Sequence, residues 1–167
     1  AERAAACVPV SFDINYGSRP WTPKEARQFL VEVLPGVRYL FVGSDDAETV
    51  FELRGAPTAV LKGFRALAPR ATIALTLGEA GCAVLDGDAE WTPRKRYAVT
   101  VVDRVGAGDA FAAGFLWAML EGRGAQVAVD AATALAALKC TIWGDIALVS
   151  LAELMELMVT DSTEIRR

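Results

Sequence analysis

The chain of 167 residues contains no histidine and only three cysteines, and both facts narrow its chemistry. The absence of histidine excludes a Ser-His-Asp triad, a Cys-His pair and a histidine-ligated zinc within this chain. The cysteines, Cys7, Cys82 and Cys140, are odd in number and have no spacing typical of a metal or redox motif. We therefore expect free, buried thiols in a reducing cytoplasm. Chemistry must rest on carboxylates, Lys or Arg, backbone amides or a bound metal.

Positive charge is also scarce. Lys and Arg number 17 against 21 Asp and Glu, a net charge of −4, and the basic cluster at residues 94–96 is short. We therefore expect no nucleic-acid partner. Charged residues interrupt every long apolar stretch, so we expect no membrane span. A hydrophobic content of 53% is typical of a folded domain, either an Ala-rich α/β domain or one whose apolar surface meets a partner, such as a second copy in a homo-oligomer.

Short β-branched runs alternate with amphipathic and apolar helical patterns along the chain. The pattern predicts strands at residues 7–14, 39–42, 72–77, 82–85 and 97–102. It predicts helices at residues 22–34, 45–53, 57–68, 110–120 and 125–139, and a terminal helix opened by a capping box at residues 150–153. Strands that alternate with helices predict an α/β fold with a parallel sheet covered on both faces.

The sharpest local feature is Gly106-Ala107-Gly108-Asp109, between an expected strand and an apolar helix. Two glycines permit a tight turn and the close approach of a ligand. The first amides of the following helix have no partner within the helix, and with the helix dipole they favour an anion such as a phosphate. The carboxylate of Asp109 can accept the proton of an attacking hydroxyl. Taken alone, the same residues are also typical of a plain turn with an Asp cap.

The longer segment at residues 103–115, DRVGAGDAFAAGF, resembles the second signature of the ribokinase family, also called the phosphofructokinase-B family. The usual form is D-T-x-G-A-G-D-x-F-x-x-G-F, and Arg104 here replaces the usual Thr. The resemblance implies a ribokinase-like three-layer αβα fold with a mainly parallel sheet, and ATP with Mg²⁺ as the phosphoryl donor. It implies an anion hole at residues 106–108 and Asp109 as the catalytic base, with Asp103 at the substrate site.

Two further segments follow the order of the same family. Thr76, Gly78 and Gly81 lie in a segment that resembles the K-x-G-x-x-G strand-turn along the nucleotide, with Thr76 in place of the usual Lys. An ordinary hairpin turn is the alternative. Asp45 and Glu48 align with the family's N-x-x-E motif, which organises magnesium, usually through water. They lie one helical turn apart on one face, although acids at a helix start are also ordinary partners of the dipole.

Within the family, residues 12–16 (FDINY) and 137–145 (ALKCTIWGD) resemble segments of 2-keto-3-deoxygluconate kinases. The resemblance places Asp13 and Asn15 near the sugar acid or the transferred phosphate, and Lys139 at the nucleotide site. Without that context, Asp13 and Asn15 are residue types that cap loops.

The chain departs from these kinases at one position that matters for the substrate. They carry Arg directly after the tyrosine, where it can pair with a substrate carboxylate. This chain has Gly17 there, and Arg19 could substitute from a different backbone position. The identity of the sugar therefore stays open.

The resemblance runs from Val8 to Leu154 but corresponds to the C-terminal half of the family. We therefore expect residues 1–167 to be a C-terminal nucleotide-binding and catalytic part, without the N-terminal part and its lid. Three functions stay open: an ATP-dependent kinase of a small sugar or sugar acid, a fragment that binds nucleotide without phosphorylating, and a non-catalytic regulatory domain. The intact turn and Asp109 favour the first two.

Overall fold

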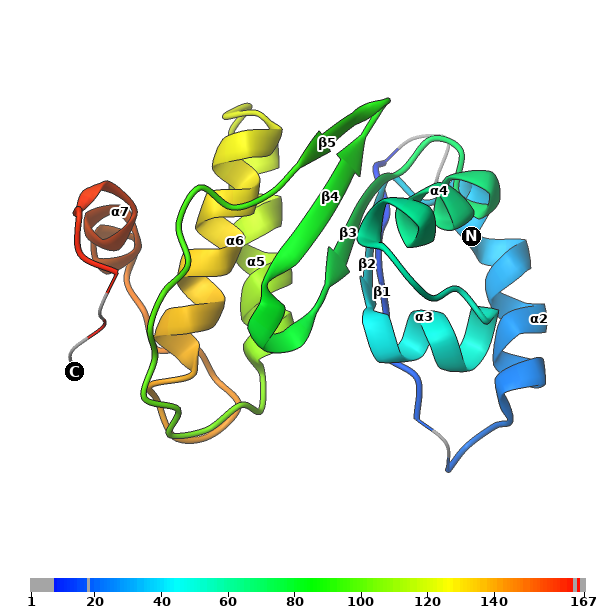
Figure 1. The fold of residues 1–167 in the computed structure, drawn as a ribbon, viewed down its shortest axis with the longest axis horizontal. Coiled ribbons are helices and arrows are strands. Elements are labelled where there is room, and N and C mark those ends of the chain that lie inside the picture. The colour runs from blue at the N-terminus through cyan, green and yellow to red at the C-terminus, as the bar shows by residue number, and fades with distance from the viewer. Residues whose placement is uncertain (1–7, 18, 164, 166–167) are drawn as a thin grey trace. The chain divides into compact units, whose positions relative to one another are not determined.

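The structure, a computed structural model, describes residues 8–17, 19–163 and 165. The chain divides into two compact units, and the boundary between them falls between Trp91 and Thr92 (Figure 1). Within the described residues, no helix is long and apolar enough to cross a membrane.

The first unit holds a five-stranded sheet in the order β1-β2-β3-β4-β5. Its strands are β1 (Ser11–Ile14), β2 (Tyr39–Gly43), β3 (Thr72–Thr76), β4 (Cys82–Asp86) and β5 (Ala89–Trp91). The strands β1, β2 and β3 are parallel to one another, and β4 is antiparallel to both of its neighbours. All strands except β4 therefore point the same way, which confirms the mainly parallel sheet expected from the sequence.

The helices of the first unit follow the predicted pattern closely. They are α2 (Pro23–Val33), α3 (Ser44–Phe51) and α4 (Pro57–Leu67), with 3₁₀ turns at Leu34–Gly36 and Gly78–Ala80. The predicted capping box opens α2, since the Glu25 amide donates to Thr22 Oγ1 at 3.3 Å and the Thr22 amide donates to Glu25 Oε2 at 2.8 Å. These bonds satisfy amides that a helix start otherwise leaves without partners.

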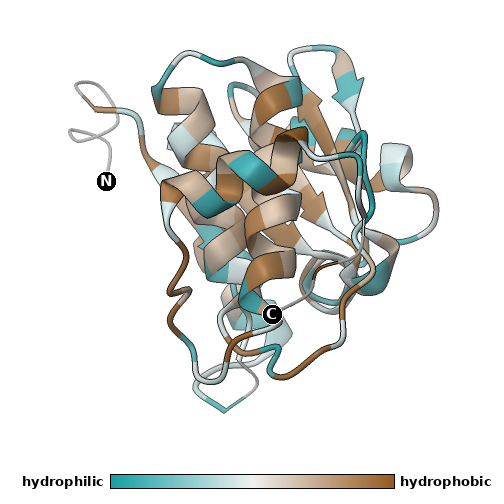
Figure 2. Cartoon of the chain, turned by 90° about the vertical axis from the view of Figure 1, so that its left-hand side faces the viewer, coloured by the Kyte–Doolittle hydropathy of each residue, from teal (hydrophilic) through white to brown (hydrophobic). Residues whose placement is uncertain are grey.

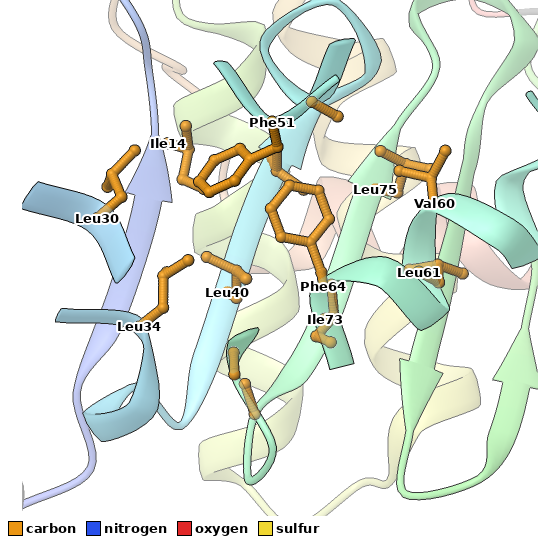
Figure 3. Close-up of a cluster of buried hydrophobic side chains, with 14 of the residues drawn as sticks. Ile14, Leu30, Leu34, Leu40, Phe51, Val60, Leu61, Phe64, Ile73 and Leu75 are labelled. Atoms are coloured by element: carbon orange, nitrogen blue, oxygen red, sulfur yellow. The ribbon is translucent and has the colours of Figure 1, made fainter. Parts of the chain in front are cut away.

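The core of this unit lies between the helices and one face of the sheet (Figure 3). Phe51 of α3 and Phe64 of α4 meet edge to face, with ring centroids 5.0 Å apart at 69°. Leu40, Ile73 and Leu75 of the strands are buried beside them. Each such side chain contributes about 1.5–3 kcal/mol on burial. The alternate strand residues are apolar as well, which is the pattern of strands covered on both faces.

The second unit contains α5 (Ala107–Leu120), α6 (Ala125–Lys139) and α7 (Leu151–Val159). A Cβ at Gly114 would lie 2.8 Å from the carbonyl oxygen of Ala131, so this glycine allows α5 and α6 to approach closely. The predicted capping box at Ser150 and Glu153 is present at the start of α7. Apolar residues predominate in α5 and α6, whereas α7 also carries Glu153 and Glu156 among its apolar residues (Figure 2). Helices that are apolar on most of their surface are typically buried.

The strand predicted at residues 97–102 is wrong. The segment is extended, but it pairs only briefly: the Ala98 amide donates to the Thr163 carbonyl at 2.9 Å, and the Val102 amide donates to the Cys140 carbonyl at 2.8 Å. The segment has the β-branched composition of a strand, but a strand also needs a neighbouring strand to pair with. The turn at Gly87 and Asp88 joins β4 to the antiparallel strand β5 as a hairpin. At the N-terminal end, β1 begins at Ser11, and Cys7 lies outside the described residues.

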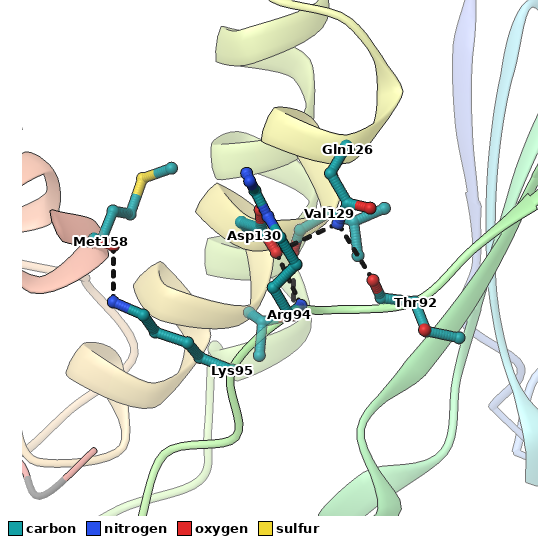
Figure 4. A network of polar contacts seen from close by, with 8 residues as sticks. Thr92, Arg94, Lys95, Gln126, Val129, Asp130 and Met158 are labelled. Atoms are coloured by element: carbon teal, nitrogen blue, oxygen red, sulfur yellow. Dashed lines mark hydrogen bonds and ion pairs between the residues drawn. The ribbon is translucent and has the colours of Figure 1, made fainter. Parts of the chain in front are cut away.

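Polar side chains fix the segment that opens the second unit (Figure 4). Arg94 donates through Nε to Asp130 Oδ2 at 2.7 Å, and its backbone amide donates to Asp130 Oδ1 at 2.9 Å. Lys95 donates through Nζ to the Met158 carbonyl at 2.8 Å. These contacts attach the segment to α6 and α7, so the basic cluster has a structural use.

Candidate functional site

The turn before α5 depends on a glycine that no other residue can replace without strain. Gly106 is the N-cap of the helix, in the left-handed conformation at φ 80° and ψ 1°. A Cβ at this position would lie 2.1 Å from the carbonyl oxygen of Asp145. Because both the backbone angle and the space require glycine, Gly106 fixes where the helix begins. As a result, α5 begins at Ala107, three residues earlier than the predicted residue 110.

The first turn of α5 presents backbone amides without partners. The amides of Ala107 and Ala110 donate to carbonyl oxygens of the preceding turn at 3.1 and 2.9 Å. Within the part of the chain that the structure describes, the amides of Gly108 and Asp109 have no hydrogen-bond acceptor. Two free amides at the positive end of a helix can bind an anion, so the geometry is compatible with the anion site that the sequence predicts, which stays a prediction.

Two features leave this site accessible. A Cβ at Gly108 would have no atom within 4 Å, so the space in front of that residue is open. The side chain of Asp109 is exposed, and its carboxylate has no hydrogen-bond partner among the described residues. Asp109 is the third residue of the helix, where the dipole favours a negative charge. A carboxylate in this position can accept a proton from a hydroxyl that lies next to the anion site.

Asp103 organises the turn through both of its carboxylate oxygens. Oδ1 accepts a hydrogen bond from the Val105 amide at 3.0 Å, and Oδ2 accepts one from the Gly144 amide at 3.0 Å. The bond from Val105 lowers the pKa of Asp103 most, and the bond from Gly144 and the charge of Lys139 lower it further against the effect of burial. The sequence assigns Asp103 to the substrate, and the structure adds this role in joining two loops.

Lys139 is fully buried beneath the same turn. Its ammonium donates to the carbonyl oxygens of Asp103 at 3.0 Å and of Ile142 at 3.2 Å. The sequence places Lys139 at the nucleotide. A direct contact with a ligand would need an exposed ammonium, whereas here both hydrogen bonds of the ammonium go to backbone carbonyls.

The other predicted site residues gather in the first unit, at the carboxyl ends of the parallel strands. Ile14 pairs with Val42 in the register of β1 and β2, and Gly43 pairs with Thr76 in the register of β2 and β3. These three strands therefore end at one edge of the sheet. The residues at or after these ends are Asp13, Asn15, Asp45, Glu48, Thr76, Gly78 and Gly81. In open α/β sheets, ligands bind outside this edge.

The segment expected along the nucleotide forms a short turn at this edge. Thr76 is half-buried and its Oγ1 donates to the Val42 carbonyl at 3.5 Å, so it closes the end of β3. Gly78 opens a 3₁₀ turn at φ 57°, and Gly81 ends it at φ 96°. The Leu77 amide donates to the Gly81 carbonyl at 2.8 Å. This exposed, glycine-bounded turn leaves backbone accessible to a ligand.

The acids expected to organise magnesium are exposed. Asp45 and Glu48 lie one turn apart on α3, and Glu48 also forms an ion pair with Arg54 at 3.9 Å. Across the described ranges, no group of three or more acidic or cysteine side chains could hold a metal directly. Two exposed carboxylates fit an ion such as Mg²⁺, which keeps several water ligands and takes others from phosphates.

Asp46 is a further acid at this edge of the sheet that the sequence does not single out. Its Oδ2 accepts a hydrogen bond from the Tyr16 amide at 3.4 Å, which joins the start of α3 to the loop after β1. Burial raises the pKa of this carboxyl above its ordinary value, against the lowering effect of the bond from Tyr16. The acidic run at residues 45–46 was the available signal, but it does not say which of the two acids faces inward.

The loop after β1 carries the residues that bear on the substrate. Asp13, Asn15, Gly17 and Arg19 are all exposed. A Cβ at Gly17 would meet the ring of Pro20 at 3.7 Å, an ordinary contact. The loop therefore has room for a side chain where the resemblance leads us to expect Arg.

Comparison with known proteins identifies the family to which the chain belongs. The model of the pfkB family of carbohydrate kinases matches residues 1–150. The chain belongs to this family. It is 31% identical over 145 residues to a 2-dehydro-3-deoxygalactonokinase of Haloferax volcanii, covering 87% of this chain and 45% of that protein. It is 33% identical over 140 residues to an ATP-dependent 6-phosphofructokinase of Thermoanaerobacterium thermosaccharolyticum, covering 83% and 42%.

Among solved structures, the 2-dehydro-3-deoxygluconokinase of Thermotoga maritima is similar, with a TM-score of 0.82 and 28% identity over 95% of this chain and 53% of that one. This likeness confirms the predicted ribokinase-like α/β fold of the pfkB family. The chain spans about half the length of the pfkB relatives that it matches.

Proposed function

We propose that the protein containing this chain transfers a phosphoryl group from ATP to a hydroxyl of a small sugar or sugar acid. In this proposal Asp109 is the base that takes the hydroxyl proton, and residues 106–108 hold the transferred phosphate. The observation that carries the proposal is the pair of free amides at Gly108 and Asp109 beside an exposed carboxylate. Phosphoryl transfer needs these two parts together, because the transition state is stabilised by positioning and by charge rather than by covalent chemistry.

ATP is the proposed donor, and the carboxyl edge of the first unit is its proposed location beside Thr76, Gly78 and Gly81. The name of the ATP-dependent relative supports the choice of nucleotide. Mg²⁺ would supply charge neutralisation at the phosphates when bound. The acids Asp45 and Glu48 would hold it through water, since both are exposed and separated by one helical turn.

A 2-keto-3-deoxygluconate-like acid is the first candidate substrate. Two relatives phosphorylate acids of this kind by name. In the loop after β1, Asp13 and Asn15 would contact the sugar, and Arg19 offers a cation for the carboxylate. The third relative is named for a sugar phosphate, so sugar phosphates and neutral sugars belong in the same test.

An activity assay on the full-length protein tests the proposal. ADP release would be followed with ATP, Mg²⁺ and a panel of keto-deoxy sugar acids and neutral sugars. We expect sugar-dependent release with the wild type, and a loss of at least about 100-fold with Asp109→Asn, the usual size of general-base effects. The control is Asp88→Asn, because Asp88 is an exposed acid in the turn between β4 and β5. Equal activity of Asp109→Asn and the wild type would contradict the role of Asp109.

A second candidate function is a nucleotide-binding fragment without kinase activity. The test of this candidate uses the 167-residue chain itself, which spans about half the length of its relatives. We expect the 167-residue chain alone to bind ATP in calorimetry but to release little sugar-dependent ADP. Loss of substrate positioning alone can remove about 7–11 kcal/mol of catalysis. Sugar-dependent turnover by this chain at the rate of the full-length protein would exclude the fragment function.

A further inference from the structure

The buried ammonium of Lys139 is the strongest feature that the proposed function leaves unexplained. Buried charges in proteins are nearly always paired or hydrogen-bonded, because an isolated one is very costly. In the part of the chain that is described, Lys139 and Thr72 are the buried polar or charged residues. Thr72 closes a strand end through its hydroxyl. Lys139 instead lies under the turn that presents the free amides.

The ammonium joins two loops that are distant in sequence. One bond goes to the Ile142 carbonyl, three residues on, as a lysine at a helix end often does. The other goes to the Asp103 carbonyl, 36 residues earlier, at 3.0 Å. This second bond is not part of an ordinary helix cap. It connects the end of α6 to the segment that leads into α5.

Further contacts continue from the same two loops to the anion site. The Asp103 carboxylate accepts the Gly144 amide at 3.0 Å, and the next residue, Asp145, places its carbonyl directly against Gly106. Gly106 is the cap that sets the start of α5. The free amides of Gly108 and Asp109 follow within three residues. A shift of the 142–145 loop would therefore move the amides that bind the phosphate.

We propose that Lys139 is a positioning residue whose ammonium acts as a fixed internal cation, holding the 103–106 and 142–145 loops together so that the turn keeps its anion-binding shape. The inference rests on the proposed function for the identity of the anion, a nucleotide phosphate. It assigns no contact between Lys139 and that nucleotide. The site requires the positive charge of the side chain as well as its volume, because both hydrogen-bond acceptors of the ammonium are carbonyl oxygens and the Asp103 carboxylate lies near it.

The test uses the ¹⁵N-labelled 167-residue chain, with amide hydrogen exchange as a readout that needs no ligand. Lys139→Met keeps most of the length of the side chain and removes the charge. We expect exchange of the Val105 and Gly144 amides to become at least about tenfold faster, since both amides donate to Asp103. Exchange at Leu40 in β2 should not change. Lys62→Met, on the exposed face of α4, is the matched control. Unchanged exchange at both amides would overturn the inference.

ATP with Mg²⁺ is then titrated while the Gly108 and Asp109 resonances are followed. The expected result is binding by the wild type and by Lys62→Met, and at least about tenfold weaker binding by Lys139→Met. No shift of these resonances in the wild type would count against the proposed function, and the exchange result would still decide the role of Lys139. Wild-type binding together with equal binding by Lys139→Met would overturn the inference alone.

A rescue experiment separates charge from packing, including the case in which Lys139→Met fails to fold. Lys139→Ala removes three methylenes and the ammonium, a space that matches propylammonium. A cavity left by truncation of a buried side chain can bind a small molecule of the missing shape. We expect propylammonium, but not propan-1-ol, to restore protection of the Gly144 amide and ATP binding. Equal rescue by both compounds, or by neither, would overturn the requirement for a cation.

Discussion

Substitutions at Gly106 and Gly108 should distinguish the stability of the turn before α5 from its ability to bind a phosphate. Gly106→Ala would place a methyl group 2.1 Å from the Asp145 carbonyl oxygen and would keep a non-glycine residue at φ 80°. The backbone angle alone costs about 1–3 kcal/mol. The collision requires a backbone shift in addition. Because 1 kcal/mol lowers the melting temperature of a chain of this size by about 2–4 °C, we expect Gly106→Ala to melt at least about 4 °C lower.

Gly108→Ala should do the opposite. No atom lies within 4 Å of a Cβ at Gly108. Ala is favoured over Gly in a helix by up to about 1 kcal/mol, so the melting temperature should stay or rise by a few degrees. The same methyl group, however, occupies the open space through which a phosphate reaches the amide. We therefore expect at least about tenfold weaker ATP binding from a fold that is as stable as the wild type.

The measurements are differential scanning calorimetry for stability and isothermal titration for ATP with Mg²⁺. Gly122→Ala is the matched control for the backbone angle, because Gly122 has φ 69° and nothing within 4 Å of its Cβ. The difference between Gly106→Ala and Gly122→Ala then reports the collision with Asp145. If Gly108→Ala binds ATP as tightly as the wild type, the amides at the start of α5 are not the phosphate site and the reasoning is refuted.

Three more predictions follow from the described contacts. In the full-length protein, Asp109→Asn should change the affinity for ATP by no more than about threefold but should remove most turnover, since the base is needed only for transfer. A loss of ATP affinity as large as the loss of turnover would contradict this prediction. Gly17→Arg should lower the Michaelis constant for a keto-deoxy sugar acid by about ten- to 100-fold and leave neutral sugars unchanged, because the loop has room for the side chain; steady-state kinetics with both sugar classes decide it. Hydrogen bonds, first that from Val105, lower the pKa of Asp103 in the folded state below 3.8. The carboxylate therefore contributes to stability above that pH, and this contribution is lost as the pH falls through the lowered pKa. Exchange of the Gly144 amide should become faster over the same pH range, and Asp103→Asn should abolish this pH dependence.

Structural features that depend only on a few adjacent residues were predictable from the sequence. The capping boxes at Thr22 and Ser150 were found where their spacing places them. These signals are local, because a cap satisfies amides three residues away and needs no distant partner. The strand at residues 72–77 was recognised for a related reason: a run buried on both faces is apolar throughout.

Features that depend on a distant neighbour were not predictable. Residues 97–102 have a strand's composition, but their hydrogen bonds go to Thr163 and Cys140 rather than to a strand. Asp46 and Asp45 are the same residue type in adjacent positions, and only packing against Tyr16 decides which one is half-buried. The burial of Lys139 has the same origin, because its second acceptor lies 36 residues away.

The turn at residues 106–109 depends both on its own residues and on contacts with residues that are distant in the sequence. Its glycines and Asp109 can be found in the sequence, because a phosphate site at a helix start needs free amides and little else. The exact position of the turn, in contrast, cannot be predicted from these residues. The position of Gly106 depends on the carbonyl of Asp145, and the loop of Asp145 is held by bonds to Asp103 and Lys139. A displacement of about 1 Å can cost about 100-fold in rate, so the residues that never touch the phosphate set how well the turn can work. A substitution at Lys139 and a substitution at Gly108 should therefore weaken the same site by different routes: the first by loosening the loops that shape the turn, the second by obstructing a turn whose shape is intact.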